Sequence, residues 1–354
     1  MNIKNLDGIN LIFHTIAPGG GMERYAVDLI LGFLDKGLKV RVIANKVKWT
    51  GPVPVGLEFF LTKTPKLFGA RVENLWFEQI AIKHINHDFP IIALSHIPAY
   101  SDLAITGGTH KSHLKRKGVI WKGFYHRKKI KNELIQFQKS KKVISHSAES
   151  SREIELDYNV STNKIVTLYP PVDTKKFSLD ARNKRENFRK EWGVNDNQIV
   201  IVFPSNDHKR KGLDLIISAL EISDPRIFLA VAGRSPVKHN RVINLGYQTD
   251  MPGVYSAADV SILASIYEPF GYVGPESILC GTPTILADTV AATEVLSYPG
   301  CFKFERKTAA LVETFKEIVK LFDENNLVLT NPHSYINYLY NLDDHIDALI
   351  EQLT

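Results

Sequence analysis

The sequence has little cysteine and no long apolar run, and these absences argue against several classes of protein. Its 354 residues contain only Cys280 and Cys301, and neither lies in a CxxC or Cys/His ligand spacing. This argues against a disulfide framework or a zinc site and indicates a reducing, cytoplasmic setting. The first residues do not resemble a signal peptide. No stretch approaches the roughly 18 apolar residues of a membrane-spanning helix, so we expect a protein that is not integral to a membrane.

The positive charge is concentrated in one segment. The net charge is +6, but residues 111–142 hold twelve Lys/Arg and one acid, Glu133, and so carry +11, which leaves −5 for the rest. Trp121, Phe124 and Tyr125 lie among these cations, a combination that suits an anionic membrane surface. We expect the segment to attach the protein peripherally to the inner face of the cytoplasmic membrane, with a solvated basic helix as the alternative. Nothing resembles a nucleic-acid recognition motif, so we expect no nucleic-acid partner.

Hydrophobic periodicity predicts two consecutive α/β units. The segment from GINLIFHT to LKVRVIA has the order strand, glycine turn, helix, strand, which implies a parallel sheet covered by helices. The pattern restarts at QIVIVFPS and runs through RIFLAVAG, SILAS and TPTILA. We therefore predict an N-terminal domain over residues 1–172 and a C-terminal domain over residues 173–333. Residues 334–354 have the pattern of an amphipathic helix, whose docking site the pattern does not give.

Two glutamates in EPFGYVGPE are the main candidates for a binding site. Pro275 suits the first position of a helix, which puts Glu276 in its first turn. The preceding loop follows a strand at the edge where open α/β sheets bind ligands, and N–H groups at a helix start attract phosphate. Glu268 and Glu276 would then bind hydroxyls of a ligand whose phosphates lie against residues 270–274. Alternatively, Glu276 complements the helix dipole and Glu268 is an ordinary exposed loop acid.

Two further loops have the composition of a substrate-binding turn. NDHKRKG, residues 206–212, places three consecutive cations between a strand and a helix, where Arg210 and Lys211 suit a pyrophosphate. A solvated turn is the alternative. PGGGMERY, residues 18–25, opens a helix with a glycine run that would let a substrate approach the backbone. It is not the GxGxxG pattern, and a tight strand-to-helix turn explains it nearly as well.

In their order along the chain, these elements resemble the retaining glycosyltransferases of family 4. The resemblance covers nearly the whole sequence and rests on GGGMERY, GGTHKSHL, KVISHSAESSREI, YPPVDTKKF, HKRKGLDLII, VYSAADVSILAS and EPFGYVGPESILCGTPTI. It implies the GT-B fold, an α/β architecture of two Rossmann-like domains facing a central cleft. In that fold the last helix crosses back to the first domain.

The resemblance also implies roles for individual residues. Glu268 would contact hydroxyls of the donor sugar, Glu276 the ribose of the nucleotide, and His110 the neighbourhood of the sugar and the acceptor hydroxyl. The other implied donor-binding positions are Gly20, Gly21, Arg210, Lys211, Tyr247, Phe270, Gly271, Tyr272 and Val273. Among these, the two cations and the backbone of residues 271–273 would hold the diphosphate, and Tyr247 would border the base.

The chain departs from the family pattern in three places. Most members have a Gly-Arg pair at the end of the first strand of the C-terminal domain, where this chain has Pro204 and Ser205. The missing charge would have to come from the basic triplet that follows. Pro275 and Ser277 replace an aliphatic residue and an alanine, and AATE, residues 291–294, replaces a glycine-rich turn. The donor sugar therefore stays open.

The implied reaction needs no metal or cofactor. Some transferases hold a metal ion with Asp-x-Asp, and this chain has no such motif. The resemblance implies retaining transfer of a hexose or N-acetylhexosamine from a nucleotide-diphosphate sugar, with UDP favoured, to a glycan or lipid-linked acceptor. Surface polysaccharide or lipopolysaccharide assembly is the expected setting. The alternatives are a nucleotide-sugar epimerase of the same fold and a basic membrane- or nucleic-acid-binding protein without turnover.

Overall fold

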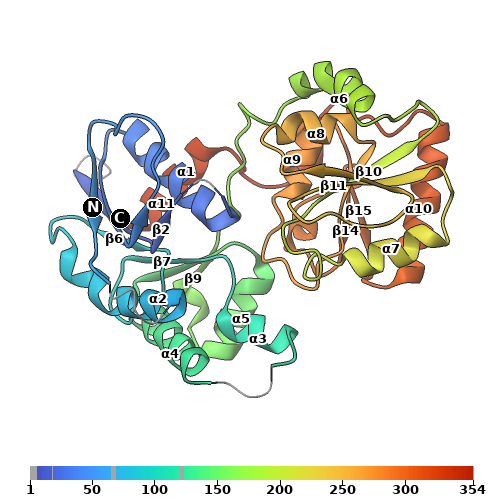
Figure 1. The fold of residues 1–354 in the computed structure, drawn as a ribbon. Helices are drawn as coiled ribbons and strands as arrows, with labels where there is room; N and C mark the ends of the chain where they lie inside the picture. The colour runs from blue at the N-terminus through green and yellow to red at the C-terminus, as the bar shows by residue number, and fades with distance from the viewer. Residues whose placement is uncertain (1–5, 18, 65–68, 120–122, 354) are drawn as a thin grey trace. The chain divides into compact units, whose positions relative to one another are not determined.

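The chain forms two compact units, each built on its own parallel sheet (Figure 1). The computed structural model describes residues 6–17, 19–64, 69–119 and 123–353. Unit 1 comprises Met1–Pro171 and Leu339–Thr354, and unit 2 comprises Val172–Tyr338. The ends of the two domains expected from the sequence, residues 172 and 333, differ from these by one and five residues.

Within the described residues, the sheet of unit 1 has the strand order β5–β3–β1–β6–β7–β8–β9. Its strands are β1 (Gly8–Ile12), β3 (Lys39–Ala44), β5 (Leu57–Leu61), β6 (Ile91–Ala93), β7 (Leu103–Thr106), β8 (Lys142–Ser145) and β9 (Ile165–Thr167), beside a short pair of β2 (Thr15–Ile16) and β4 (Lys46–Val47). The direction of winding reverses between β1 and β6. In such sheets the carboxyl ends of these two strands border the usual ligand-binding edge.

The helices of unit 1 cover this sheet. They are α1 (Gly21–Asp35), α2 (Gly69–Ile80), α3 (His110–Arg116), α4 (Phe124–Lys139), α5 (Ala148–Tyr158) and α11 (Leu342–Leu353), with 3-10 turns η2 (Ala81–His84) and η3 (Thr162–Lys164). Tyr25, Leu29 and Phe33 of α1 are fully buried, as their helical spacing predicts.

The last helix belongs to unit 1, as the resemblance implied, but it is shorter than its sequence pattern. It lies beside α1 (Figure 1), so close that a Cβ on Gly32 would meet Ile346 Cγ1 at 2.5 Å. The helix begins only at Leu342, because Asn341 Oδ1 accepts a hydrogen bond from the backbone N–H of Asp344 at 2.8 Å. The preceding residues do not continue this α-helix: Pro332–Tyr335 form a 3-10 turn, and Ile336 makes an isolated bridge to Leu296.

Unit 2 has the strand order β12–β11–β10–β13–β14–β15, which is the 3-2-1-4-5-6 order of dinucleotide-binding domains. Its strands are β10 (Ile199–Pro204), β11 (Ile227–Ala232), β12 (Val242–Gly246), β13 (Val260–Leu263), β14 (Thr284–Ala287) and β15 (Cys301–Phe304). Its helices are α6 (Arg185–Glu191), α7 (Leu213–Glu221), α8 (Met251–Ala257), α9 (Val273–Leu279) and α10 (Thr308–Asp323), with 3-10 turns η4 (Leu179–Lys184), η5 (Ala291–Glu294) and η6 (Pro332–Tyr335).

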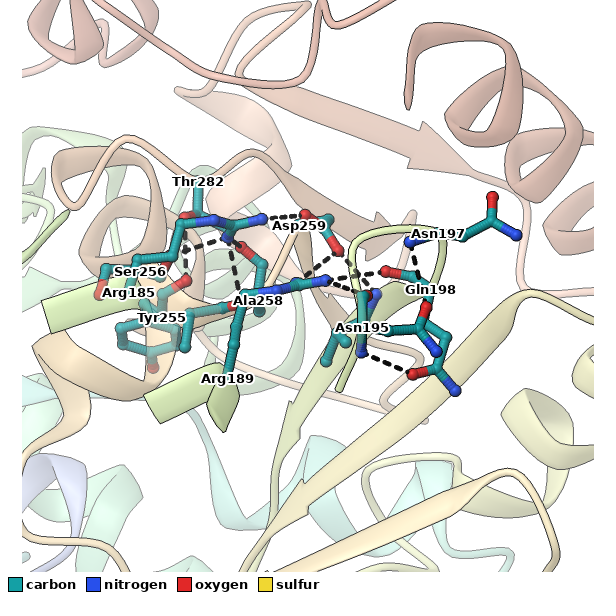
Figure 2. A network of polar contacts seen from close by, with 12 residues as sticks. Arg185, Arg189, Asn195, Asn197, Gln198, Tyr255, Ser256, Ala258, Asp259 and Thr282 are labelled. Atoms are coloured by element: carbon teal, nitrogen blue, oxygen red, sulfur yellow. Dashed lines mark hydrogen bonds and ion pairs between the residues drawn. The ribbon is translucent and has the colours of Figure 1, made fainter. Parts of the chain in front are cut away.

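A network of buried charges fixes the amino ends of β10 and β13 (Figure 2). Arg185 and Arg189 of α6 both point toward Asp259, which directly precedes β13. Arg189 also donates to the carbonyls of Asn195 and Gln198, each at 3.0 Å, and Asp259 accepts from the N–H of Val200 at 2.7 Å. The donors and acceptors satisfy one another, so the network can hold the central strands in register.

Candidate active site

The candidate residues of unit 2 gather at the opposite, carboxyl ends of the same two strands. Arg210 and Lys211 lie in the loop between β10 and α7, and Glu268 lies in the loop between β13 and α9. Glu276 lies within α9. The strand order reverses between β10 and β13, so this is the edge at which an open α/β sheet accommodates a ligand.

Glu268 is held in an ion pair and is not an ordinary exposed loop acid. Arg210 Nη1 lies 2.8 Å from Glu268 Oε2 and 3.3 Å from the carbonyl oxygen of Tyr267. The hydroxyl of Ser265 donates to the same carboxylate oxygen at 3.4 Å. The backbone of Glu268 is fixed by a bridge to Val290. The sequence placed Arg210 on the diphosphate, but it did not show that this guanidinium also orients Glu268.

Lys211 is close enough to both Glu268 and Glu276 to interact with their charges. Burial lowers the pKa of its ammonium group, while the negative charges of Glu268 and Glu276 favour the charged form and act against that fall in pKa. Its Nζ donates to the carbonyl oxygen of Pro204 at 3.3 Å. Glu276 is itself buried and accepts a hydrogen bond from the hydroxyl of Tyr255 at 3.0 Å. At this sheet edge, the cations that could attract an anionic ligand are Lys211 and the neighbouring Arg210.

The loop between the glutamates differs in detail from the expectation. Helix α9 begins at Val273 with Tyr272 as its N-cap, so Pro275 is the third helical residue and not the first. The position is tolerated because N–H groups of the first turn need no intrahelical partner. Gly271 has φ +102°, which few other residues adopt. The side chain of Phe270 is buried, so only its backbone could face a ligand.

At the end of β12, Tyr247 presents an aromatic ring to solvent. Its side chain is 59% exposed, and the guanidinium of Arg234 lies 5.0 Å from the ring centroid. Arg234 follows β11, the neighbouring strand, so both residues lie at the same sheet edge as Arg210. An exposed aromatic face beside a cation is compatible with the expected contact to a base.

Sequence reasoning missed two hydrogen bonds of His208, which fix the loop that carries the basic triplet. His208 Nδ1 lies 2.8 Å from the hydroxyl oxygen of Ser205, and its Nε2 lies 2.8 Å from the carbonyl oxygen of Ser235. Because a carbonyl oxygen only accepts, Nε2 carries the proton and Nδ1 accepts from Ser205. Ser205 lies where the family has its Gly-Arg pair. In this chain the two hydrogen bonds of His208 connect the loop to Ser205 and to Ser235, which follows β11.

In unit 1, a histidine follows each of four adjacent strands. His14, His96, His110 and His146 come one to four residues after β1, β6, β7 and β8, which are neighbours in the sheet. His110 is the first residue of α3, and its Nε2 lies 2.9 Å from Nδ1 of His126. The full recurrence could not be seen in the sequence, because the strand before His110 is not predicted from it, and the histidines show no spacing of a ligand motif.

The two glycine-rich loops of unit 1 lie next to each other. Gly20 is the N-cap of α1 and Gly21 its first residue. Gly20 has φ −66°, a conformation open to any residue, so the turn itself does not require glycine there. A Cβ on Gly107, which precedes His110 in the second loop, would meet Met22 Sδ at 3.1 Å. The start of α1 therefore borders the loop that carries His110.

Two kinds of site are absent from the described part of the chain. No group of three or more His, Cys, Asp or Glu among the described residues is arranged to hold a metal ion. Across the same residues, none of the helices combines the length and apolar character needed to cross a membrane.

Solved structures with the same architecture cover almost the entire chain. WaaG, a glycosyltransferase involved in lipopolysaccharide biosynthesis, superposes with a TM-score of 0.79 at 17% identity, over 98% of this chain and 99% of that chain. Sucrose-phosphate synthase from Thermosynechococcus elongatus gives 0.76 at 17% identity, over 98% of each chain. Anabaena HepE in complex with UDP and glucose gives 0.73, also at 17% identity and over 98% of each chain. The protein therefore has the GT-B fold of glycosyltransferases.

Sequence relatives identify the family. Residues 19–176 match glycosyltransferase family 4, and residues 184–325 match the glycosyl transferases group 1. A probable transglycosylase of Burkholderia thailandensis is 36% identical over 293 residues, which cover 82% of this chain and 80% of that protein. Mannosylfructose-phosphate synthase of Agrobacterium fabrum is 26% identical over 200 residues, 49% of this chain and 44% of that protein. The chain belongs to the family 4, group 1 glycosyltransferases.

Proposed function

We propose that this glycosyltransferase moves a hexose or N-acetylhexosamine from a UDP-sugar to a glycan or lipid-linked acceptor, with retention and without a metal ion. The observation that carries the proposal is the group of Arg210, Lys211 and Glu268 at the carboxyl ends of β10 and β13. It combines two cations for a diphosphate with a carboxylate for sugar hydroxyls. A UDP complex of HepE, which shares the fold, supports UDP as the nucleotide.

The mechanism follows from the charges that develop during transfer. Cleavage of a glycosyl–diphosphate bond leaves negative charge on the departing oxygen, and Arg210 and Lys211 would stabilise it without a metal ion. A donor of this kind typically contributes about 3–4 kcal/mol to lowering the barrier. Glu268, held by Arg210, would accept hydrogen bonds from the sugar and orient it, and it would not act as a covalent nucleophile. Glu276, held by Tyr255, would accept hydrogen bonds from the ribose hydroxyls.

A thermal-shift experiment tests the donor site directly. The protein is melted with UDP, GDP, ADP or CMP in the presence of EDTA, and we expect UDP to raise the Tm. A ligand at 100 times its Kd adds about 2.7 kcal/mol, which is several degrees for a protein of this size. Glu276→Ala should abolish the shift, whereas the control Glu313→Ala, on an exposed position of α10, should keep it. No shift with any nucleotide would contradict the donor assignment.

We further propose that the basic segment of unit 1 holds the enzyme peripherally on an anionic membrane, at its cytoplasmic face. Several cations of the segment are already engaged in ion pairs and are less available for contact with lipid headgroups. These pairs are Lys111 with Asp157, Arg116 with Glu149, and Lys129 with Glu78. Lys115, Lys117, Lys131 and Lys139 are exposed, and Phe124 at the start of α4 is 82% exposed. Trp121 and the other residues of 120–122 lie outside the described residues.

Flotation with anionic vesicles at low salt tests this attachment. Each cation near such a surface contributes about 1 kcal/mol, so the double variant Lys131→Glu/Lys139→Glu should leave the vesicle fraction. Lys316→Glu, at an exposed position of unit 2, is the matched control. Equal flotation of all three proteins would count against the basic segment, and failure of the unaltered protein to float would remove the membrane proposal.

A further inference from the structure

Unit 1 contains a buried carboxylate that the proposed transfer chemistry does not use. Glu133 of α4 is 0% exposed. Its Oε1 accepts a hydrogen bond from the backbone N–H of His110 at 2.8 Å and lies 3.3 Å from His96 Nε2. Its Oε2 accepts a hydrogen bond from the hydroxyl of Tyr158. The carboxylate thus contacts the first residue of α3 directly.

The hydrogen bonds around His96 determine where its proton lies. Gln136 donates through Nε2 to the carbonyl oxygen of Ser95 at 2.9 Å, so its amide oxygen is the atom 3.3 Å from His96 Nδ1. An amide oxygen only accepts, and therefore Nδ1 carries a proton. A neutral His96 then presents the lone pair of Nε2 to Glu133. Two lone pairs facing each other repel, so the contact requires one proton between Nε2 and the carboxylate.

Electrostatics place that proton on the carboxylate side. Burial raises the pKa of Glu133 to about 7, against the opposing effects of the Tyr158 hydroxyl and the His110 N–H. Burial and the charge of Lys129 hold the pKa of His96 well below its ordinary value. The titratable or charged groups that face the pair are Glu78 of α2, Lys129 of α4, His110 of α3, Tyr158 of α5 and His14 beyond β1. Below about pH 7, a protonated Glu133 donates to a neutral His96.

We propose that Glu133 is a positioning residue whose protonated carboxyl, bonded to His96, fixes the start of α3 and with it the imidazole of His110. This inference rests on the proposed function and on the role that the family resemblance implies for His110, near the sugar and the acceptor hydroxyl. Above about pH 7 the proton is lost, and the carboxylate faces the bare Nε2. The charge of the carboxylate and the lone pair of Nε2 repel each other, which pushes Glu133 and His96 apart. Because Oε1 also accepts the N–H of His110, this displacement moves the start of α3, so transfer falls with rising pH.

The pH profile of turnover tests the positioning role. Turnover is measured as UDP released from UDP-glucose or UDP-N-acetylglucosamine, whichever the thermal-shift experiment selects. For the unaltered enzyme we expect kcat to be constant below about pH 7 and to fall about tenfold per pH unit above it, because one proton is required. This descending part of the profile is the limb near pH 7. Glu133→Gln has no proton to lose, so its kcat should be lower but level across this limb, with little change in the KM for the donor. The same limb in both proteins would overturn the proposal.

Tyr158→Phe provides a second variant, for which the direction of the change in the pH profile can be predicted. The Tyr158 hydroxyl donates to the carboxylate and so favours the ionised form. Its removal raises the pKa of Glu133 further, and the limb should move to higher pH. Tyr100→Phe, which removes an exposed hydroxyl in the same unit, should leave the limb in place. A limb that is unchanged or moved to lower pH in Tyr158→Phe would contradict the inference.

Infrared spectroscopy of the full chain without substrate tests the proton separately from catalysis. A band of a protonated carboxyl should disappear as the pH rises through about 7, and Glu133→Gln should lack it. Absence of the band in the unaltered protein would overturn the inference. If the band titrates but no UDP-sugar is turned over, the shared proton stands and the proposed function fails.

Discussion

The two units have related parallel sheets, but they bury polar groups in different ways. Unit 2 pairs full charges: Arg185 and Arg189 meet Asp259 at the amino ends of β10 and β13. Unit 1 contains nine of the twelve histidines; His146 and His345 are buried, and His14 and His96 are partly buried. Paired charges stay ionised over a wide pH range. A buried histidine stays neutral, because burial disfavours its charged form, and acid then favours the unfolded chain, in which it can be protonated. The same architecture should therefore respond differently to pH in its two halves.

The largest expected effect is the acid sensitivity of unit 1. Burial lowers the pKa of His14 to about 4 and the pKa of His146 and His345 to about 3. Between these values and 6.5 the unfolded chain binds more protons than the folded one, so stability is lost as the pH falls through this range. Each group contributes on the order of a few kcal/mol. Hydrogen exchange from pH 7 to 4 should show unit 1 losing protection before unit 2.

A single variant sharpens that expectation. His146→Phe keeps an aromatic ring against Tyr25 but cannot be protonated, so unit 1 should tolerate acid better than in the unaltered protein. His87→Gln, an exposed position of the same unit, serves as control. Simultaneous loss of protection in both units as the pH falls would show that the buried histidines do not decide the difference.

The next effect concerns the charge network of unit 2. Asp259→Ala leaves two buried or half-buried guanidinium groups without their carboxylate, and breaking such a pair typically costs about 3–5 kcal/mol. Denaturation followed by hydrogen exchange should show the loss in unit 2, with unit 1 unchanged. Asp196→Ala, in an exposed position of the neighbouring loop, should have little effect. A small loss in Asp259→Ala would mean that the network adds little to stability.

Removal of Glu268 is expected to raise the free-energy barrier to transfer by a comparable amount. Glu268→Ala should bind UDP nearly normally, because the cations and Glu276 remain, while transfer falls on the order of 10²–10³-fold. Nucleotide binding is measured by thermal shift and turnover by UDP release. Loss of UDP binding in this variant would refute the assignment of Glu268 to the sugar.

The smallest effect is expected for the loop that lies between the two glutamates. Gly271→Ala introduces a Cβ at φ +102° and 2.6 Å from Val290 Cγ1, so we expect a loss of about 1–3 kcal/mol. Gly246→Ala, also at positive φ but in open space, separates the cost of backbone strain from that of the clash. Equal Tm values for both variants would show that the contact with Val290 is unimportant.

Two of the strands that sequence analysis missed lie at the edges of their sheets. QIVIVFPS and RIFLAVAG became β10 and β11, whose residues are almost all buried and therefore form continuous apolar runs. LEFFL and CFKF, which became the edge strands β5 and β15, were not predicted. Only Leu57 is buried in β5, and each edge strand pairs on one side. The central β7 was missed because LAIT is too short to show a period.

The sequence by itself determined the α/β order, the family and the candidate groups that we propose for a nucleotide sugar, because periodicity and motif spacing are local properties of the chain. It did not determine their partners. The Arg210–Glu268 pair joins residues 58 apart, and the Glu133–His96 contact joins residues from different elements. Only the tertiary structure decided these pairs, since strand order brings distant loops to one edge and burial then decides which charges are kept.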